Sequence, residues 1–161
     1  MLIEPFQPNY MELVRNRSST NFFKNAACVG PTYTNSSIQL AYSNLMTSTL
    51  EISSTIPNPK DYAANGAKLF GEKFALFEAP ACTLNSILIE ANAPFLINLL
   101  CLDVEGTELE VLKGLDHTKY RFGYICVEST QFGEISNYLS SHNYSYIGAL
   151  SKHDHLFKNS Q

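Results

Sequence analysis

One segment limits the possible folds of this chain more than any other, the sequence LLCLDVEGTELEVLKGL at residues 99–115. An apolar run leads to Asp103, Glu105 follows two positions later, and an amphipathic helical pattern comes next. Such a run is typical of a strand buried on both faces of a parallel sheet, and a helix usually follows it. The segment therefore predicts a strand, turn and helix of an α/β fold, with Thr107 and Glu110 spaced as a helix capping box.

The same alternation of apolar strands and helices occurs in other parts of the chain. Strands are expected at residues 2–3, 21–29 and 120–129, and helices at 8–17, 82–92 and 133–144. The last two apolar runs, at 144–150 and 153–157, are expected to form an antiparallel pair at the sheet edge. A chain of 161 residues fits one domain, so we expect a single α/β domain over residues 1–161 with a mostly parallel sheet.

Residues 31–80 have a different composition, rich in Ser, Thr and Asn with several prolines. The sequences SIQLAYS and STLEIS alternate enough to predict a β-hairpin, whereas IPNPKDYAANGAKLFGEK has little regular pattern. The segment is too poor in apolar residues to form a core of its own. We therefore expect an ordered hairpin and loop insertion over one end of the sheet, with a disordered linker as the alternative.

Composition argues against several classes of partner. The formal net charge of -4 disfavours nucleic-acid binding, which usually requires a basic face. No run of eighteen apolar residues is present, so no transmembrane helix is expected. None of the four cysteines forms a CxxC pair, and Cys101 and Cys126 lie within apolar runs. Buried, reduced thiols are expected, which favours the cytoplasm.

Three of the predicted strands end in a carboxylate, namely Glu4, Asp103 and Glu128. In open α/β sheets, ligands bind outside the carboxyl ends of the strands, so the three acids would line one crevice. A carboxylate there can accept two hydrogen bonds from the vicinal hydroxyls of a ribose. The alternative is that these acids only mark the points at which strands meet solvent.

Four segments resemble one known family: LIEPFQPNYMELVRNR, LLCLDVEGTELEVLKG, ICVEST and HDHLF. They look like the FkbM-type methyltransferases, which depend on S-adenosylmethionine and have a Rossmann-like fold. The similarity extends, with gaps, from Leu2 to about Phe157. Its most specific part is the Asp-Val-Glu-Gly sequence with the helix that follows.

The resemblance implies which residues bind S-adenosylmethionine. Glu4 would bind the ribose hydroxyls, and Ala26 and Ala27 would lie near the adenine. Asp103 would lie beside the methionine portion or the transferred methyl group. These four residues are the predicted cofactor site.

The resemblance also implies an acceptor side of the same pocket. Glu105 would shape it, and either Asp103 or Glu105 would be the catalytic base for an acceptor hydroxyl. Glu128 and His155 would contact the substrate. A metal site at His153 and His155 is the alternative for that segment, but no third strong ligand lies nearby in the sequence, so no metal is predicted.

One part of the family pattern has no counterpart in the sequence. The family begins with a strand and a glycine-rich turn that wraps the carboxypropyl end of the cofactor, and no residues before MLIEP supply it. The expected fold is therefore a Rossmann-like class I methyltransferase sheet with its first strand missing. Three explanations are open: a fragment or misplaced start codon, a degenerate relative, or a protein completed by a partner chain or another copy.

The sequence leaves two functions open. The first is an FkbM-type methyltransferase that uses S-adenosylmethionine to methylate a hydroxyl of a small metabolite or sugar. The second is a truncated, inactive methyltransferase-like module that acts by protein binding or is completed by a partner chain.

Overall fold

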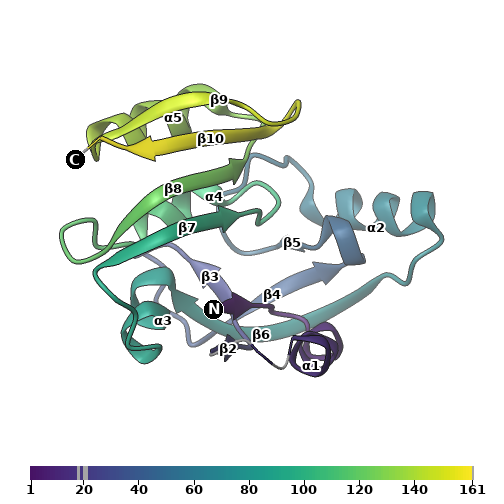
Figure 1. The fold of residues 1–161 in the computed structure, drawn as a ribbon. Coiled ribbons are helices and arrows are strands. Elements are labelled where there is room, and N and C mark those ends of the chain that lie inside the picture. The colour runs from purple at the N-terminus through teal and green to yellow at the C-terminus, as the bar shows by residue number, and fades with distance from the viewer. Residues whose placement is uncertain (18, 20–21, 161) are drawn as a thin grey trace.

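The computed structural model describes residues 1–17, 19 and 22–160 (Figure 1). Its strands are β1 (Leu2–Ile3), β2 (Phe23–Lys24), β3 (Ala27–Val29), β4 (Ser37–Tyr42), β5 (Ser48–Thr49), β6 (Ala75–Thr83), β7 (Leu96–Leu102), β8 (Arg121–Glu128), β9 (Tyr144–Ala149) and β10 (Asp154–Asn159). Its helices are α1 (Gln7–Asn16), the short 3-10 helix η1 (Asn44–Met46), α2 (Pro59–Phe70), α3 (Leu84–Glu90), α4 (Glu108–Lys113) and α5 (Phe132–Ser141). The start of the predicted strand at 21–29, Asn21, lies outside the described residues.

The described strands form mixed sheets. One sheet has the order β7-β8-β10-β9, a second has the order β3-β6-β4-β5, and β1 pairs with β2 (Figure 1). Parallel pairing joins β1 to β2, β3 to β6 and β7 to β8, and the other pairs are antiparallel. The α/β class and the late antiparallel pair β9–β10 are thus confirmed. A single, mostly parallel sheet is not seen among the described residues, because β1 pairs with β2 and β7 pairs with β8, with no pairing between β1 and β7.

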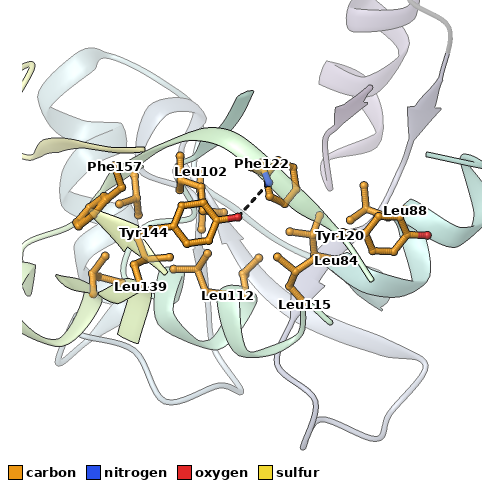
Figure 2. Close-up of a cluster of buried hydrophobic side chains, with 14 residues drawn as sticks. Leu84, Leu88, Leu102, Leu112, Leu115, Tyr120, Phe122, Leu139, Tyr144 and Phe157 are labelled. Carbon is orange, nitrogen blue, oxygen red and sulfur yellow. Dashed lines mark hydrogen bonds between the residues drawn. The ribbon is translucent and has the colours of Figure 1, made fainter. Parts of the chain in front are cut away.

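The larger hydrophobic core lies between the β7-β8-β10-β9 sheet and the helices α3, α4 and α5 (Figure 2). Ile135 and Leu139 of α5 are 1% and 0% exposed, which confirms the predicted apolar face of that helix. Phe122 of β8 and Tyr144 of β9 are also buried in this core. The core therefore fixes β7 and β8, the strands that lead to Asp103 and Glu128.

Strand β7 is much more exposed than its sequence predicts. Leu96 and Leu99 are 56% and 50% exposed, and Cys101 is exposed as well. The prediction of a strand buried on both faces, with a buried Cys101, is therefore wrong. The reason is that β7 is an edge strand, paired with β8 on one side. Its apolar composition alone cannot distinguish an edge from the middle of a sheet.

The middle segment contains the predicted hairpin, because β4 and β5 pair in antiparallel fashion. It also contains helix α2, where the sequence showed no pattern. The buried face of α2 consists of Ala63, Gly66 and Ala67, which are too small to give a clear apolar period. The helix ends at Gly71, whose φ of 68° is the left-handed conformation common after helices.

Strand β6 connects this segment to the rest of the domain. It runs through residue 80, pairing with β4 on one side and with β3 on the other. The strands within residues 31–80 therefore share a sheet with β3, which precedes the segment, although the division into a single domain with an insertion stays a prediction. None of the helices in the described part of the chain has the length and apolarity that a membrane span requires.

The start of α4 differs in detail from the predicted capping box. Thr107 is the N-cap residue, but its side chain makes no capping hydrogen bond. The backbone N–H of Gly106 instead donates to Oε1 of Glu108 at 2.8 Å. Glu110 instead forms an ion pair within the helix, with 2.7 Å between its Oε1 and Nζ of Lys113. The helix forms as predicted, but the carboxylate that stabilises its first turn is that of Glu108 and not that of Glu110.

Candidate functional site

A cavity of about 630 Å³ lies beside the carboxyl ends of β1 and β7. Five residues that the sequence selected for a cofactor and acceptor pocket all line it: Glu4, Ala26, Ala27, Asp103 and Glu105. They come from three separate parts of the chain, so the fold brings them together. The volume is within the range of about 300–1,000 Å³ that is usual for small-molecule sites.

Glu4 is held in place by the backbone that follows it. The N–H of Phe6 donates to Oε1 of Glu4 at 2.8 Å. The side-chain amide of Asn25 donates to the carbonyl oxygens of Glu4 and Pro5 at 2.8 and 3.0 Å. A carboxylate has acceptor capacity on both oxygens, so one bond to Phe6 fixes Glu4 and still permits a ligand diol to bind.

A second, smaller cavity of about 160 Å³ shares two residues with the first. Asp103 and Glu105 line both cavities. The smaller cavity is strongly acidic, since Glu108 and Glu128 also line it, and His153 lies on its wall. The two carboxylates predicted as catalytic therefore stand where the two cavities adjoin.

The turn between β7 and α4 presents these carboxylates in an unusual backbone conformation. Glu105 has a φ of 52° and Gly106 a φ of 95°. A residue with a side chain rarely adopts a positive φ, which costs on the order of 1–3 kcal/mol. Hydrogen bonds to Oε1 of Glu108 from the backbone N–H groups of Val104 and Gly106, at 3.4 and 2.8 Å, help to hold this turn.

A family model described as the methyltransferase FkbM domain matches residues 1–146. The chain belongs to the FkbM methyltransferase family. The resemblance inferred from the sequence is thus confirmed, and membership indicates a methyltransferase. Searches of curated proteins and of solved structures each gave no match.

The matched part of the FkbM domain includes every carboxylate that lines the two cavities, and it ends before both histidines of the His-Asp-His segment. Of these histidines, His153 lines the smaller cavity. His155 lies outside the lining of both cavities, with its ring centroid 4.7 Å from that of Phe132 and 6.1 Å from that of Tyr146. Glu128 therefore lines the smaller cavity but not the larger cavity with Glu4, and His155 lines neither cavity.

Burial and neighbouring negative charges raise the pKa of Glu105 and of Glu128. Burial raises the pKa of Glu105 to about 7; a hydrogen bond from Tyr62 lowers it, and the charges of Asp103, Glu128 and Glu108 add to the rise. Burial also raises the pKa of Glu128, as does the neighbouring Asp103. A carboxylate with a pKa near 7 is well suited to exchange protons at neutral pH.

Tyr62 is a cavity-lining residue that the sequence did not indicate. It lies on α2 and lines the smaller cavity, where its hydroxyl donates to Oε2 of Glu105 at 2.9 Å. No local pattern marks it, because α2 itself was not predicted. Within the described residues, no group of three or more His, Cys, Asp or Glu side chains is arranged to hold a metal ion.

Proposed function

We propose that this FkbM domain binds S-adenosylmethionine and transfers its methyl group to a hydroxyl oxygen of a small metabolite or sugar. The observation that carries the proposal is the shared lining of the larger cavity by Glu4, Ala26, Ala27, Asp103 and Glu105. The matched family supports methyl transfer, and the resemblance of these positions supports the cofactor.

The residues of the larger cavity fit this cofactor. Glu4 is fixed by Phe6 and retains acceptor capacity for the two hydroxyls of a ribose. The small side chains of Ala26 and Ala27 leave room for a flat adenine ring beside them. Asp103 would face the positively charged end of the cofactor. When bound, S-adenosylmethionine supplies an electrophilic methyl group on a sulfonium.

The chain contributes positioning and a base. We assign the base to Glu105, with Asp103 as the other candidate, because both line the junction of the two cavities. A hydroxyl in the smaller cavity would lose its proton to the Glu105 carboxylate as its oxygen bonds to the methyl carbon. The carbon–sulfur bond breaks in the same displacement, and its electron pair stays on sulfur. Positioning of this kind supplies most of the acceleration in such transfers.

The acceptor is expected to be neutral or cationic. Asp103, Glu105, Glu108 and Glu128 all line the smaller cavity, and their charges would repel an anionic acceptor. A sugar hydroxyl group can donate hydrogen bonds to such carboxylates. Glu128 is the strongest candidate for contact with the acceptor, whereas a contact by His155 would require a movement of its ring toward the cavity.

Calorimetric titration with S-adenosylmethionine tests the proposal. The wild-type protein should bind the cofactor, and Glu4→Ala should weaken binding by about tenfold or more, since a charge-assisted pair of hydrogen bonds is lost. Glu12→Ala, at an exposed position of α1, is the matched control and should bind like the wild type. Absence of heat at millimolar cofactor would contradict the proposal, as would equal affinity of Glu4→Ala and the wild type.

The unpaired edges of β1 and β7 favour a second candidate function, a module completed by a partner chain or by another copy. In the described part of the chain β1 pairs only with β2 and β7 only with β8, so each has an unpaired edge. Residues of both strands line the larger cavity, and Leu99 is half exposed. An extended segment could add to such an edge by backbone hydrogen bonds. Failure to bind S-adenosylmethionine, together with a stable dimer or a captured partner strand in solution, would favour this candidate.

We also propose a reducing compartment such as the cytoplasm. The four cysteines, Cys28, Cys82, Cys101 and Cys126, are free thiols in the structure. Free thiols persist in reducing compartments, so their state supports this proposal.

A further inference from the structure

The segment before and within α2 contacts the turn that carries Glu105. The backbone N–H of Thr55 donates to the carbonyl oxygen of Gly106 at 2.9 Å. The hydroxyl of Tyr62 donates to Oε2 of Glu105 at 2.9 Å. The space above Gly106 is so narrow that a Cβ there would lie 2.6 Å from Oγ of Ser54. Thr55, Ile56 and Tyr62 therefore form one wall of the smaller cavity, and Tyr62 contacts the Glu105 carboxylate.

Tyr62 is the group from this wall that acts directly on Glu105. The other titratable groups around Glu105 in the cavity are Asp103 and Glu108 from the β7–α4 region, Glu128 at the end of β8, and His153 from the turn before β10. The three carboxylates repel a negative charge on Glu105. The Tyr62 hydroxyl instead donates a hydrogen bond to that charge, and it also fixes the direction of the carboxylate.

We propose that Tyr62 is a positioning residue, whose hydroxyl holds the Glu105 carboxylate at the junction of the two cavities in the orientation that receives the acceptor proton. This inference rests on the proposed function. With Oε2 bound to Tyr62, the acceptor hydroxyl would give its proton to Oε1 of Glu105 while the acceptor oxygen bonds to the methyl carbon. The carbon–sulfur bond of the sulfonium would break in the same step and leave its electron pair on sulfur. The insertion that contains α2 therefore contributes to the chemistry of the site as well as to its wall.

The hydrogen bond should leave a measurable mark on the titration of Glu105. Burial raises the pKa of Glu105 to about 7, and the bond from Tyr62 lowers it. Removal of the hydroxyl in Tyr62→Phe should therefore raise the midpoint of Glu105 further, by about 0.5 to 1 pH unit. Tyr62 lies outside the lining of the larger cavity, so the same variant should bind S-adenosylmethionine within about twofold of the wild type.

The experiment is an NMR titration of the full chain labelled with ¹³C at the glutamate carboxyl carbons, with Glu105→Gln used to assign the signal. The comparison is between the wild type, Tyr62→Phe and the control Tyr124→Phe, which removes a hydroxyl from an exposed tyrosine of β8. We expect a raised Glu105 midpoint in Tyr62→Phe alone. An unchanged midpoint, an equal rise in Tyr124→Phe, or a loss of cofactor affinity above about tenfold in Tyr62→Phe would overturn the proposal.

Failure of the inference can be told apart from failure of the proposed function. If the wild type does not bind S-adenosylmethionine, the proton-accepting role is overturned even when the midpoint rises. If the wild type binds S-adenosylmethionine but Tyr62→Phe has the same Glu105 titration midpoint as the wild type, only the role of Tyr62 is overturned. Should Tyr62→Phe not fold, 3-fluorotyrosine incorporation makes the phenol a stronger donor and should lower the Glu105 midpoint, and an unchanged midpoint would overturn the proposal.

Discussion

The hydroxyl oxygen of Tyr144 accepts a hydrogen bond from the backbone N–H of Phe122 at 3.0 Å, in the interior of the larger core (Figure 2). Both residues are buried, with exposed fractions of 2% and 1%. This bond joins β9 to β8, which are not neighbours in their sheet, since β10 lies between them. It therefore ties the last part of the sheet to the strand that ends at Glu128.

Tyr144→Phe should lower the free energy of unfolding by about 1–3 kcal/mol, because it leaves the N–H of Phe122 buried without an acceptor. Urea unfolding followed by circular dichroism measures the change. Tyr146→Phe, at a tyrosine of the same strand that is 43% exposed, is the control and should change stability by less than about 0.5 kcal/mol. Equal effects of the two variants would show that the bond makes no special contribution.

Gly106→Ala should destabilise the protein. Its φ of 95° disfavours a side chain, and the new Cβ would lie 2.6 Å from Ser54 Oγ and 2.8 Å from Thr55 Oγ1. A loss of about 1–3 kcal/mol is expected from the backbone strain alone. Gly133→Ala is the matched control, because nothing lies within 4 Å of a Cβ there. It should leave the thermal midpoint unchanged or slightly raised, and a similar loss in both variants would contradict the argument.

Glu105 should make stability depend on pH in a defined direction. Its pKa of about 7 in the folded protein lies above the ordinary value of 4.5. The protonated carboxyl group thus contributes stability that is fully present below about pH 4.5 and is lost as the pH rises through 7. Glu105→Gln, which is neutral at every pH, should unfold at a higher temperature than the wild type at pH 8.

The difference between Glu105→Gln and the wild type should shrink as the pH falls toward 5, as measured by differential scanning calorimetry. Glu12→Gln, on the exposed side of α1, should show no such trend. A Glu105→Gln variant that is less stable than the wild type at pH 8, or a difference that is constant with pH, would contradict the assigned pKa.

If the edge of β7 pairs with another copy of the chain, Leu99→Lys should reduce that self-association. Leu99 is 50% exposed on the edge strand β7, and a lysine on such an edge discourages pairing with another strand. Dynamic light scattering over a range of protein concentrations measures the effect. Leu69→Lys is the control, since Leu69 is 76% exposed on α2, and the variant should associate like the wild type. If both substitutions have the same effect, general surface hydrophobicity explains the association and the β7 edge does not.

The sequence predicted those elements in which local pattern and packing agree. Ile135 and Leu139 were placed on the buried face of α5 because their spacing follows the helical period, and the core uses that spacing. The strands that lead to Asp103 and Glu128 were predicted from their apolar runs, although the burial predicted for β7 was wrong. Their acids were proposed to share a crevice with Glu4 because the ends of parallel strands meet at one edge of a sheet.

The features that the sequence missed depend on contacts between distant segments. The exposure of Leu99 reflects which neighbours β7 has, and the run of apolar residues carries no information on that point. Helix α2 packs through Gly66, where a Cβ would lie 2.5 Å from Sδ of Met46, so its buried face has almost no hydrophobic signal. Tyr62 was missed for the same reason, since its role depends on a hydrogen bond across 43 residues of chain.

The pairing of β6 has a consequence for attempts to shorten this protein. Residues 75–80 of β6 pair with β4 and residues 81–83 pair with β3, so a deletion of residues 31–80 would cut through β6 and keep only the part that pairs with β3. The deletion would also remove Ile38, Leu40 and Ala79, which pack with Ala27 and Val29 in a second buried cluster, and Ile38 and Leu40 line the larger cavity. A minimal version of the domain therefore has to keep the hairpin.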